Sequence, residues 1–403
     1  MNFIFVSLQR LNTGRESTST SLAKELAKKH NVLYVNPPID RKTFNSSSND
    51  KYVDEHIKMI KNGDIDLLKR ISNLHVFNPP TVLESINWIP FTSVFNIFNL
   101  VNNRRFAKDI QLAIDRIGFS SFILINDKDI FRSFYLKELL KPQLYIYLDR
   151  DNTLAIKYWK KHGKYLEPLL MKKSDVVVCN SPVFRDKALR FNDNSHYIGN
   201  GCGLDLYKGT DQIKVPDELT SIKGPIIGYV GALNSSRLDL ALITEIVNSR
   251  SGWSFVFIGP DDQDFKSSGL YNLPNVYYLG KIHNNEVASY INHFDVCINP
   301  QLVNEITDGN FPLKIVEYLA LGKPTVATET RTMKEIFHEF TYLASNRDEY
   351  LQLIELAIKE DTTNLKEQRK TFARQFGWDK IADNLLLTIK DAARDVIIPQ
   401  SSL

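Results

Sequence analysis

Short apolar runs alternate with amphipathic helical stretches along the chain, and this alternation limits the fold more than any other feature of the sequence. Residues 21–29, for example, place their apolar side chains on one helical face. Apolar strands separated by helices are typical of βαβ units, in which a parallel sheet is covered on both sides. Strands are expected at residues 3–7, 32–35, 74–78, 122–125, 144–148 and 176–180. The first half therefore predicts a doubly wound domain.

The pattern lapses at residues 199–224, which begin with a glycine-rich turn and continue with polar residues, and then it restarts. We expect a helix at residues 312–321 and strands at 226–230, 255–258, 276–278, 296–299 and 325–327. The predicted fold class is α/β, with two Rossmann-like doubly wound domains facing a cleft. The domains are expected at 1–205 (N-terminal, acceptor side), 206–378 (C-terminal, donor side) and 379–403 (a C-terminal helix, with packing on the first domain as an option).

Composition excludes several classes of protein. The 50 basic and 47 acidic residues of the 403 nearly cancel, which argues against a nucleic-acid-binding module. Three widely spaced cysteines show neither a disulfide framework nor a zinc spacing. No uncharged run reaches the ~18 residues that span a bilayer. We expect a cytoplasmic protein, with peripheral contact to the inner membrane face left open.

Residues 310–324 carry the most informative motif. Pro312 suits the first position of a helix, and Gly322 suits its end. Because a strand precedes this helix, its amino end should open at the carboxyl edge of the sheet and favour an anion. Lys314 and Glu317 share one face there: an ammonium suits a phosphate, and a carboxylate can accept hydrogen bonds from ribose hydroxyls. The alternative is a solvated Lys–Glu pair on the surface.

This segment resembles the donor-site motif of retaining glycosyltransferases of the GT-B fold, in particular glycosyltransferase family four and its teichuronic-acid and cell-wall polysaccharide members. Weaker similarities lie at residues 32–38, 145–149 and 200–201 and at Trp378. The resemblance implies that Glu317 binds the donor ribose. Where such families often have another Glu, this chain has Gly309, with the acids Asp308 and Glu305 nearby. Asp308 is our catalytic candidate, and an acidic surface loop is the alternative.

The other predicted donor-side residues lie in three loops. Gly231 ends a strand and lets the backbone approach a diphosphate, and Arg237 is placed to hold that diphosphate, although a tight βα turn with a surface Arg is the alternative. Lys314, Arg237 and Asp308 are our predicted catalytic residues. The resemblance also implies that the loop near Ile282 binds the base of the nucleotide. The loop before the predicted helix adds the donor-binding candidates Gly309, Asn310 and Phe311.

The N-terminal half offers weaker candidates. By the same resemblance, Gly14 and Arg15 lie in a loop that faces the donor diphosphate, and a surface turn is the alternative. Asp127 and Asp149 follow two predicted strands and are our acceptor-side candidates, with exposed helix caps as the alternative. Many relatives have a His in this region, and none occurs here between His75 and His162.

Lysines form a basic stripe at residues 157–173. Its lysines fall at helical spacing, at positions 157, 160, 161 and 164, with two more at 172 and 173. Such a stripe is typical of a solvated helix face, and the alternative is contact with anionic lipid head groups.

Together these features predict a glycosyltransferase that moves a sugar from a nucleoside diphosphate sugar, a UDP-sugar in our interpretation, to a hydroxyl of a glycan or lipid-linked acceptor. The resemblance implies retention of anomeric configuration and a role in surface polysaccharide synthesis. No segment reads as a metal-bound diphosphate site, so we expect no required metal or cofactor. A nucleotide-sugar epimerase and a non-catalytic nucleotide-sugar-binding subunit are the alternatives.

Overall fold

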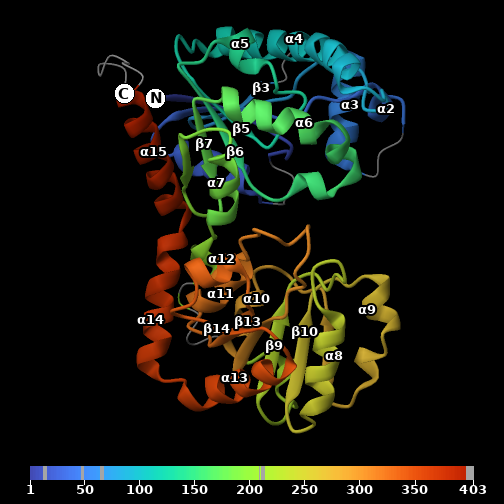
Figure 1. Cartoon of the computed structure of the whole chain (residues 1–403), viewed down its shortest axis with the longest axis vertical. Helices are drawn as coiled ribbons and strands as arrows, with labels where there is room; N and C mark the ends of the chain where they lie inside the picture. The colour runs from blue at the N-terminus through green and yellow to red at the C-terminus, as the bar shows by residue number, and fades with distance from the viewer. Residues whose placement is uncertain (12–15, 47–49, 64–67, 208, 210–213, 396–403) are drawn as a thin grey trace. The chain divides into compact units, whose positions relative to one another are not determined.

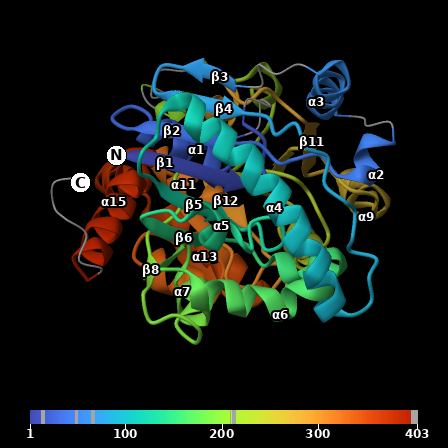
Figure 2. The ribbon, with the colours of Figure 1, turned by 90° about the horizontal axis from the view of Figure 1, so that it is seen from above.

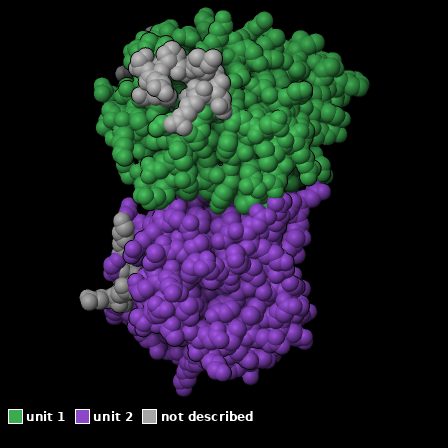
Figure 3. Space-filling model, turned by 60° about the vertical axis from the view of Figure 1, so that its left-hand side comes forward, with its two compact units in different colours: residues 1–199, 378–403 green, residues 200–377 purple. Residues whose placement is uncertain are grey.

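The structure is a computed structural model that describes residues 1–11, 16–46, 50–63, 68–207, 209 and 214–395. The chain divides into two compact units (Figure 3). Unit 1 combines residues 1–199 with residues 378–403, and unit 2 comprises residues 200–377. The chain therefore leaves unit 1 and returns to it with helix α15 (Trp378–Asp395).

Unit 1 is built on an eight-stranded sheet with the strand order β3-β4-β2-β1-β5-β6-β7-β8. Its neighbouring strands run parallel, except that β3 at one edge pairs antiparallel with β4. The strands are β1 (Asn2–Ser7), β2 (Asn31–Val35), β3 (Leu68–Ile71), β4 (Leu74–Phe77), β5 (Ile123–Asp127), β6 (Leu144–Asp149), β7 (Val176–Cys179) and β8 (Ser195–Tyr197).

Helices cover both faces of this sheet. Because side chains alternate along a strand, Phe3 and Phe5 of β1 pack against α1 and α15, whereas Ile4 and Val6 pack against α4–α7 on the other face. Figure 2 shows α4 lying across the strands, with α6 beside its amino-terminal half. The helices are α1 (Thr18–Leu26), α2 (Arg41–Phe44), α3 (Lys51–Asn62), α4 (Thr92–Ile117), α5 (Leu136–Leu140), α6 (Lys157–Lys173), α7 (Pro182–Ala188) and α15.

Unit 2 contains a six-stranded sheet in which all neighbouring pairs are parallel, with the order β11-β10-β9-β12-β13-β14. The strands are β9 (Ile226–Val230), β10 (Ser254–Ile258), β11 (Val276–Gly280), β12 (Val296–Asn299), β13 (Thr325–Thr328) and β14 (Tyr342–Ala344). Helices α8, α9 and α13 pack on one face of the sheet, and α10, α11, α12 and α14 pack on the other (Figure 1). Their bounds are α8 (Leu240–Ser249), α9 (Gln263–Ser267), α10 (Val287–Asn292), α11 (Leu313–Ala320), α12 (Arg331–Ile336), α13 (Arg347–Glu360) and α14 (Thr363–Ala373).

The strand order of unit 2 fixes where a ligand would bind. From β9 the chain moves outward to β10 and β11, and from β12 it moves the opposite way to β13 and β14. In open parallel sheets this reversal leaves a crevice at the carboxyl ends of the two central strands, and ligands bind there. Gly231 follows β9 and the α11 segment follows β12, so both lie at this switch point.

The predicted pair of doubly wound domains is confirmed, and every predicted strand forms within two residues of its expected bounds. Strands β3, β8 and β14 were not predicted. All three are short and lie at sheet edges. An edge strand does not need apolar side chains on both faces. Because β3 and β8 contain polar residues such as Lys69, Arg70 and Ser195, they lack the apolar run by which the other strands were predicted.

Candidate functional site

Helix α11 is the element around which the predicted site is built. It begins at Leu313, so Pro312 is its N-cap residue and not its first helical residue as predicted. Pro312 has no side-chain acceptor and forms no capping hydrogen bond, and the Ile315 amide donates to the Pro312 carbonyl at 3.0 Å. At the other end Gly322 adopts a φ of 72°, a left-handed conformation that favours glycine and stops the helix. The amino end of α11 therefore keeps the backbone donors that an anion needs.

Tyr318 ties α11 to the central strand of the sheet. Its buried hydroxyl accepts a hydrogen bond from the Val230 amide at 2.9 Å and donates one to the Val230 carbonyl at 3.3 Å. Phe294 packs against Gly228 so closely that a Cβ at that glycine would lie 1.9 Å from the ring. The two Tyr318 hydrogen bonds hold the second turn of α11 at the end of β9.

Lys314 points back over that strand end. Its ammonium donates a hydrogen bond to the Tyr229 hydroxyl and lies 4.2 Å from the centre of the Tyr229 ring. Burial lowers the pKa of Lys314 to about 8; the nearby Glu317 carboxyl acts to raise it, and the charge of Arg237 acts to lower it further. The hydrogen-bonding partner of the Lys314 ammonium is thus uncharged, so the positive charge of the lysine is available to a bound anion.

Gly231 makes room beside this ammonium. Its φ of 144° favours glycine, and a Cβ placed there would lie 3.1 Å from Lys314 Nζ and 3.0 Å from the Tyr229 hydroxyl. Its amide donates to the Ile258 carbonyl at 2.9 Å and is therefore already used. Gly231 contributes space to the site and not the backbone donor that a phosphate loop usually supplies.

Arg237 lies on the turn between β9 and α8. The backbone of this turn is fixed, because the Arg237 amide donates to the Asn234 carbonyl at 2.9 Å and the Arg237 carbonyl accepts from Leu302 at 2.8 Å. The side chain itself is exposed. Its charge acts to lower the pKa of Lys314.

Glu317 occupies the next turn of α11, on the same face as Lys314. It is half-buried, and the Tyr207 hydroxyl donates a hydrogen bond to it from the 3-10 turn Leu204–Tyr207. Burial raises the pKa of Glu317, while Tyr207 and Lys314 act to lower it. The carboxylate therefore lies beside a hydroxyl donor and an ammonium, at a position that suits a diol.

The loop before α11 contains the remaining predicted residues of this half. Asp308 is exposed, and Gly309 is buried with a φ of 74°. The Oδ1 atom of Asn310 is buried without a hydrogen-bonding partner among the described residues, as expected of an acceptor that a ligand or water satisfies. The Phe311 ring packs against Phe337, with ring centres 5.3 Å apart, so only the backbone of Phe311 is left for a ligand.

The remaining predicted donor-side residues lie in two other segments of the chain. Ile282 lies in the loop after β11 and packs against the core cluster that also contains Val230 and Ile315. Gly14 and Arg15 lie outside the described residues.

Sequence reasoning missed Tyr229 and Tyr207, the partners of Lys314 and Glu317. A tyrosine inside an apolar strand reads as core, and Tyr229 is indeed buried. Tyr207 follows a stretch without regular periodicity. The position of Tyr229 could have indicated its role, because it lies two residues before Gly231 at the carboxyl end of a predicted strand, where side chains often contact a ligand.

The acceptor-side prediction for Asp127 and Asp149 is not supported by their surroundings, because both carboxylates are fully buried. Asp127 accepts two hydrogen bonds from Arg150, at 2.6 and 3.0 Å, and a third from Ser7 at 2.7 Å. Asp149 pairs with the buried Lys128, which also contacts Glu167 at 2.7 Å. Both aspartates are therefore occupied by cations of the protein and are inaccessible to an acceptor.

Both aspartates also begin Asp-x-Asp triplets, at 127–129 and 149–151. In each triplet the first carboxylate is held by a protein cation. No group of three or more His, Cys, Asp or Glu residues that could hold a metal ion occurs within the described ranges.

Unit 1 instead presents a cavity of about 610 Å³ where β1, β2 and β5 end. Arg10 and Arg132 line it together with acidic residues Asp40 and Asp50. Burial and the charge of Arg132 lower the pKa of Arg10 to about 10, against the opposing charge of Asp50. A second cavity of about 150 Å³ shares Arg132 and is bordered by aromatic side chains, namely Phe95, Phe131, Tyr158 and Trp159.

His56 positions Arg10 in this cavity. The imidazole is buried, and its Nδ1 accepts a hydrogen bond from Arg10 at 3.1 Å while its Nε2 donates to the Pro79 carbonyl at 2.9 Å. Burial and the Arg10 charge lower the pKa of His56 to about 4, with the Pro79 hydrogen bond opposing them, so the ring is neutral near pH 7. The neutral histidine orients the guanidinium without cancelling its charge.

Comparison with known proteins decides the nature of the second unit. Residues 224–359 match the family model described as "Glycosyl transferases group 1". These residues form a group 1 glycosyltransferase domain. They include Gly231, Arg237, Lys314 and Glu317, so the geometry described above belongs to the glycosyltransferase domain itself.

Two curated proteins are similar in sequence. The putative teichuronic acid biosynthesis glycosyltransferase TuaH of Bacillus subtilis is 28% identical over 240 residues, which cover 57% of this chain and 60% of TuaH. An uncharacterized 41.2 kDa protein in the cps region of Klebsiella pneumoniae is 24% identical over 267 residues, which cover 64% of this chain and 69% of that protein. The matched segment therefore spans about three fifths of TuaH.

Solved structures confirm the fold over the whole chain. Anabaena HepE in complex with UDP aligns with a TM-score of 0.68 and 15% identity, covering 97% of this chain and 100% of that one. Sucrose-phosphate synthase from Thermosynechococcus elongatus aligns with a TM-score of 0.64 and 14% identity, covering 98% of each chain. The predicted GT-B glycosyltransferase fold is thus confirmed.

None of the helices in the described part of the chain has the length and hydrophobicity needed to cross a bilayer.

Proposed function

We propose that this chain transfers a sugar from a nucleoside diphosphate sugar, specifically a UDP-sugar, to a hydroxyl group of a glycan or lipid-linked acceptor, with retention of configuration and without a required metal. The observation that carries the proposal is the uncapped amino end of α11, where Lys314 lies on the neutral Tyr229 beside the space left by Gly231. The sequence similarity to TuaH and the fold similarity to HepE, which was solved with UDP, support this choice.

In the proposed reaction, the bond between the anomeric carbon and the diphosphate breaks, and negative charge develops on the departing phosphate. The acceptor oxygen bonds to the anomeric carbon, and its proton passes to the departing diphosphate. Lys314, Arg237 and the free amides of α11 stabilise that charge. Glu317 accepts hydrogen bonds from the ribose hydroxyls and so fixes the position of the anomeric carbon. The loop of Asp308 and Gly309 approaches the transferred sugar, and the loop of Ile282 contacts the base.

The donor site is tested by calorimetric titration with UDP. Replacing Lys314 by Ala removes a charge-assisted hydrogen bond, and we expect affinity to fall roughly tenfold to a hundredfold. Glu317→Gln should weaken UDP by about tenfold, because an amide is a poorer acceptor for a diol than a carboxylate. The matched control is Lys334→Ala in α12, an exposed lysine paired with Glu329, which should bind UDP normally. Unchanged UDP affinity in a folded Lys314→Ala protein would remove the basis of the proposal.

The residue at position 309 is also consistent with a second function, that of a non-catalytic nucleotide-sugar-binding subunit. The position at which the related families often have a Glu is Gly309, and its φ of 74° is unfavourable for a residue with a side chain. A non-catalytic nucleotide-sugar-binding subunit would need no acid there. Binding of UDP-sugars without turnover across a panel of acceptors would favour that function. Conversion of the donor alone would favour an epimerase.

For the acceptor, we propose the unit 1 cavity lined by Arg10 and Arg132 in place of Asp127 and Asp149. The guanidiniums of Arg10 and Arg132, the latter ion-paired with Asp129 at 2.9 Å, share this cavity with the carboxylates of Asp40 and Asp50. This mixture of hydrogen-bond donors and acceptors suits the hydroxyl groups of a sugar. Arg132→Ala should raise the KM for such an acceptor about tenfold or more while leaving UDP affinity unchanged. An unchanged KM would show that the acceptor binds elsewhere.

A further inference from the structure

Helix α4 reverses the usual arrangement of polar and apolar residues over its first half. Three of its four asparagines, Asn99, Asn102 and Asn103, are buried. Asn99 and Asn103 each donate to the Phe131 carbonyl at 2.9 Å. Asn102 exchanges two hydrogen bonds with the backbone of Glu84, at 2.9 and 3.0 Å. These bonds fix the rotation of the helix about its axis and therefore determine which side chains face outward.

The outward side of the same segment is apolar. Phe91 is 69% exposed, Ile97 66% and Phe98 51%, and Trp88 in the preceding turn is 76% exposed. Val94 and Val101 continue the row at helical spacing. A helix on the surface of a globular protein normally shows the opposite pattern, and exposed apolar patches of this kind mark interaction surfaces.

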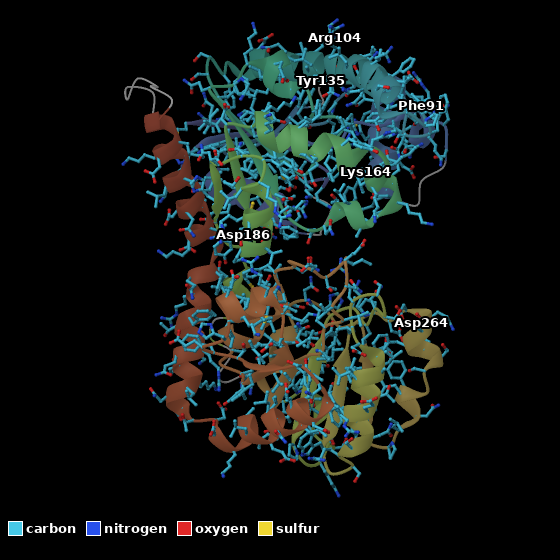
Figure 4. The ribbon with its side chains drawn as sticks, in the orientation of Figure 1. Phe91, Arg104, Tyr135, Lys164, Asp186 and Asp264 are labelled. Carbon is cyan, nitrogen blue, oxygen red and sulfur yellow. The ribbon has the colours of Figure 1, made fainter. Side chains whose placement is uncertain are left out.

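Helix α6 lies beside this segment and adds positive charge. Lys161 donates to the carbonyls of Asn87 and Trp88 at 2.8 and 3.0 Å, and Thr92 is hydrogen-bonded to His162 at 3.0 Å. Four of the six lysines in the predicted stripe are exposed, at positions 157, 160, 164 and 172. Tyr165 and Leu169 are exposed among them. Figure 4 labels Phe91 at the start of α4 and Lys164 on α6.

Acidic side chains are nearly absent from these two segments. Residues 85–108 contain no Asp or Glu, and the one acid of α6, Glu167, is buried between Lys128 and Lys187. The acids at the borders are ion-paired: Glu84 with Arg41 and Arg105, Glu138 with Lys173, and Asp151 with Arg150. The surface formed by residues 88–101 and the exposed lysines of α6, here called the docking face, is therefore apolar and basic.

We infer that the docking face binds the surface of a membrane containing anionic lipids. Aromatic and aliphatic side chains enter the boundary between head groups and acyl chains, and lysines reach lipid phosphates with their stems along the apolar surface. A second copy of the chain fits less well, since a symmetric contact would set basic helices against each other. This inference goes beyond the proposed sugar transfer and does not depend on it.

The test is co-sedimentation of the full chain with vesicles of phosphatidylcholine alone or mixed with phosphatidylglycerol. The chain should bind the mixed vesicles more tightly. Replacing Phe91, Ile97 and Phe98 together by Gln should weaken binding by at least about tenfold, because their apolar surface no longer enters the bilayer. Replacing Lys157, Lys164 and Lys172 by Gln should lower affinity for the mixed vesicles by roughly fivefold per lysine. The control is Leu387→Gln on α15, a 60% exposed leucine outside the docking face.

Three outcomes would overturn the inference: no binding of the unmodified chain to anionic vesicles, equal binding of the triple apolar variant, or a self-association that this variant abolishes while vesicle binding persists. UDP affinity is measured on the same proteins and should be unchanged in all of them. A failure of vesicle binding is thereby distinguished from a failure of the donor site.

Discussion

At the scale of single residues, Lys314 is the side chain on which the proposed chemistry most depends. It is desolvated, yet its hydrogen-bonding partner is the uncharged hydroxyl of Tyr229. Glu317 is near enough to affect its pKa but is itself engaged by Tyr207. A half-buried cation with an incomplete counter-charge is stabilised when an anion binds, and in the proposed function the diphosphate of a nucleotide supplies that anion.

This arrangement predicts that UDP affinity depends on pH. Because the pKa of Lys314 in the free protein is about 8, the ammonium is present below that value and binding is strongest there. Above it the lysine loses its proton, and UDP affinity should fall by up to about tenfold per pH unit. Calorimetry across this range measures the profile.

The matched variant is Lys314→Arg. A guanidinium stays protonated well above pH 8, so this variant should show a flat profile over the same range even if its affinity is lower. A flat profile in the unmodified chain, or a fall that persists in the Arg variant, would show that Lys314 does not titrate at the donor site.

At the scale of helices and strands, the sequence predicts the two segments that frame the site. Apolar runs predict strands β9 and β12, Gly231 marks the end of β9, and Pro312 marks the start of α11. Each of these elements begins within one residue of its predicted position. These signals are local: a strand needs apolar side chains on both faces, and glycine and proline mark where it ends. They do not reveal Tyr229 or Tyr207, which reach the site only through tertiary packing.

The same limit explains the acceptor side. Asp127 and Asp149 are polar residues at strand ends, a pattern that also marks ligand sites. Their partners, Arg150 and Lys128, come from neighbouring loops and turn both positions into buried ion pairs. Strand β5 was predicted to end at Ile125 but extends to Asp127, since the paired carboxylate can remain inside the sheet.

Lys128 joins three elements of unit 1, because it follows β5 and contacts Asp149 of β6 and Glu167 of α6. Lys128→Met would leave both carboxylates buried beside an apolar side chain. We expect a loss of about 3–5 kcal/mol in the free energy of unfolding, measured by urea denaturation. The exposed pair of Lys24 and Glu16 is the control, and Lys24→Met should cost less than about 1 kcal/mol. Equal small losses in both variants would mean that the buried cluster is not a structural link.

At the scale of the whole molecule, the chain is two doubly wound units joined by two crossings, at residues 199–200 and 377–378. The second crossing returns α15 to unit 1, where Ile381, Leu385 and Ile389 pack against the core that contains Leu22 of α1. Unit 1 is therefore completed by the last helix of the described chain, whereas the predicted donor residues that the structure describes all belong to unit 2.

This division predicts separable effects. Leu385 is fully buried, so Leu385→Ala should lower the stability of unit 1 by about 2–5 kcal/mol, measured by urea denaturation with a tryptophan signal. UDP affinity, measured below the unfolding transition, should be retained. The neighbouring exposed Leu387 gives the control, since Leu387→Ala should change neither property. Loss of UDP affinity in a folded Leu385→Ala protein would contradict this assignment of roles.

The most direct measurement is a crystal structure of the chain with UDP bound. We expect the diphosphate at the amino end of α11, within hydrogen-bonding distance of Lys314 Nζ, and the ribose hydroxyls hydrogen-bonded to Glu317. A nucleotide bound at another place, with Lys314 still in contact with Tyr229 alone and the amino end of α11 vacant, would contradict this expectation.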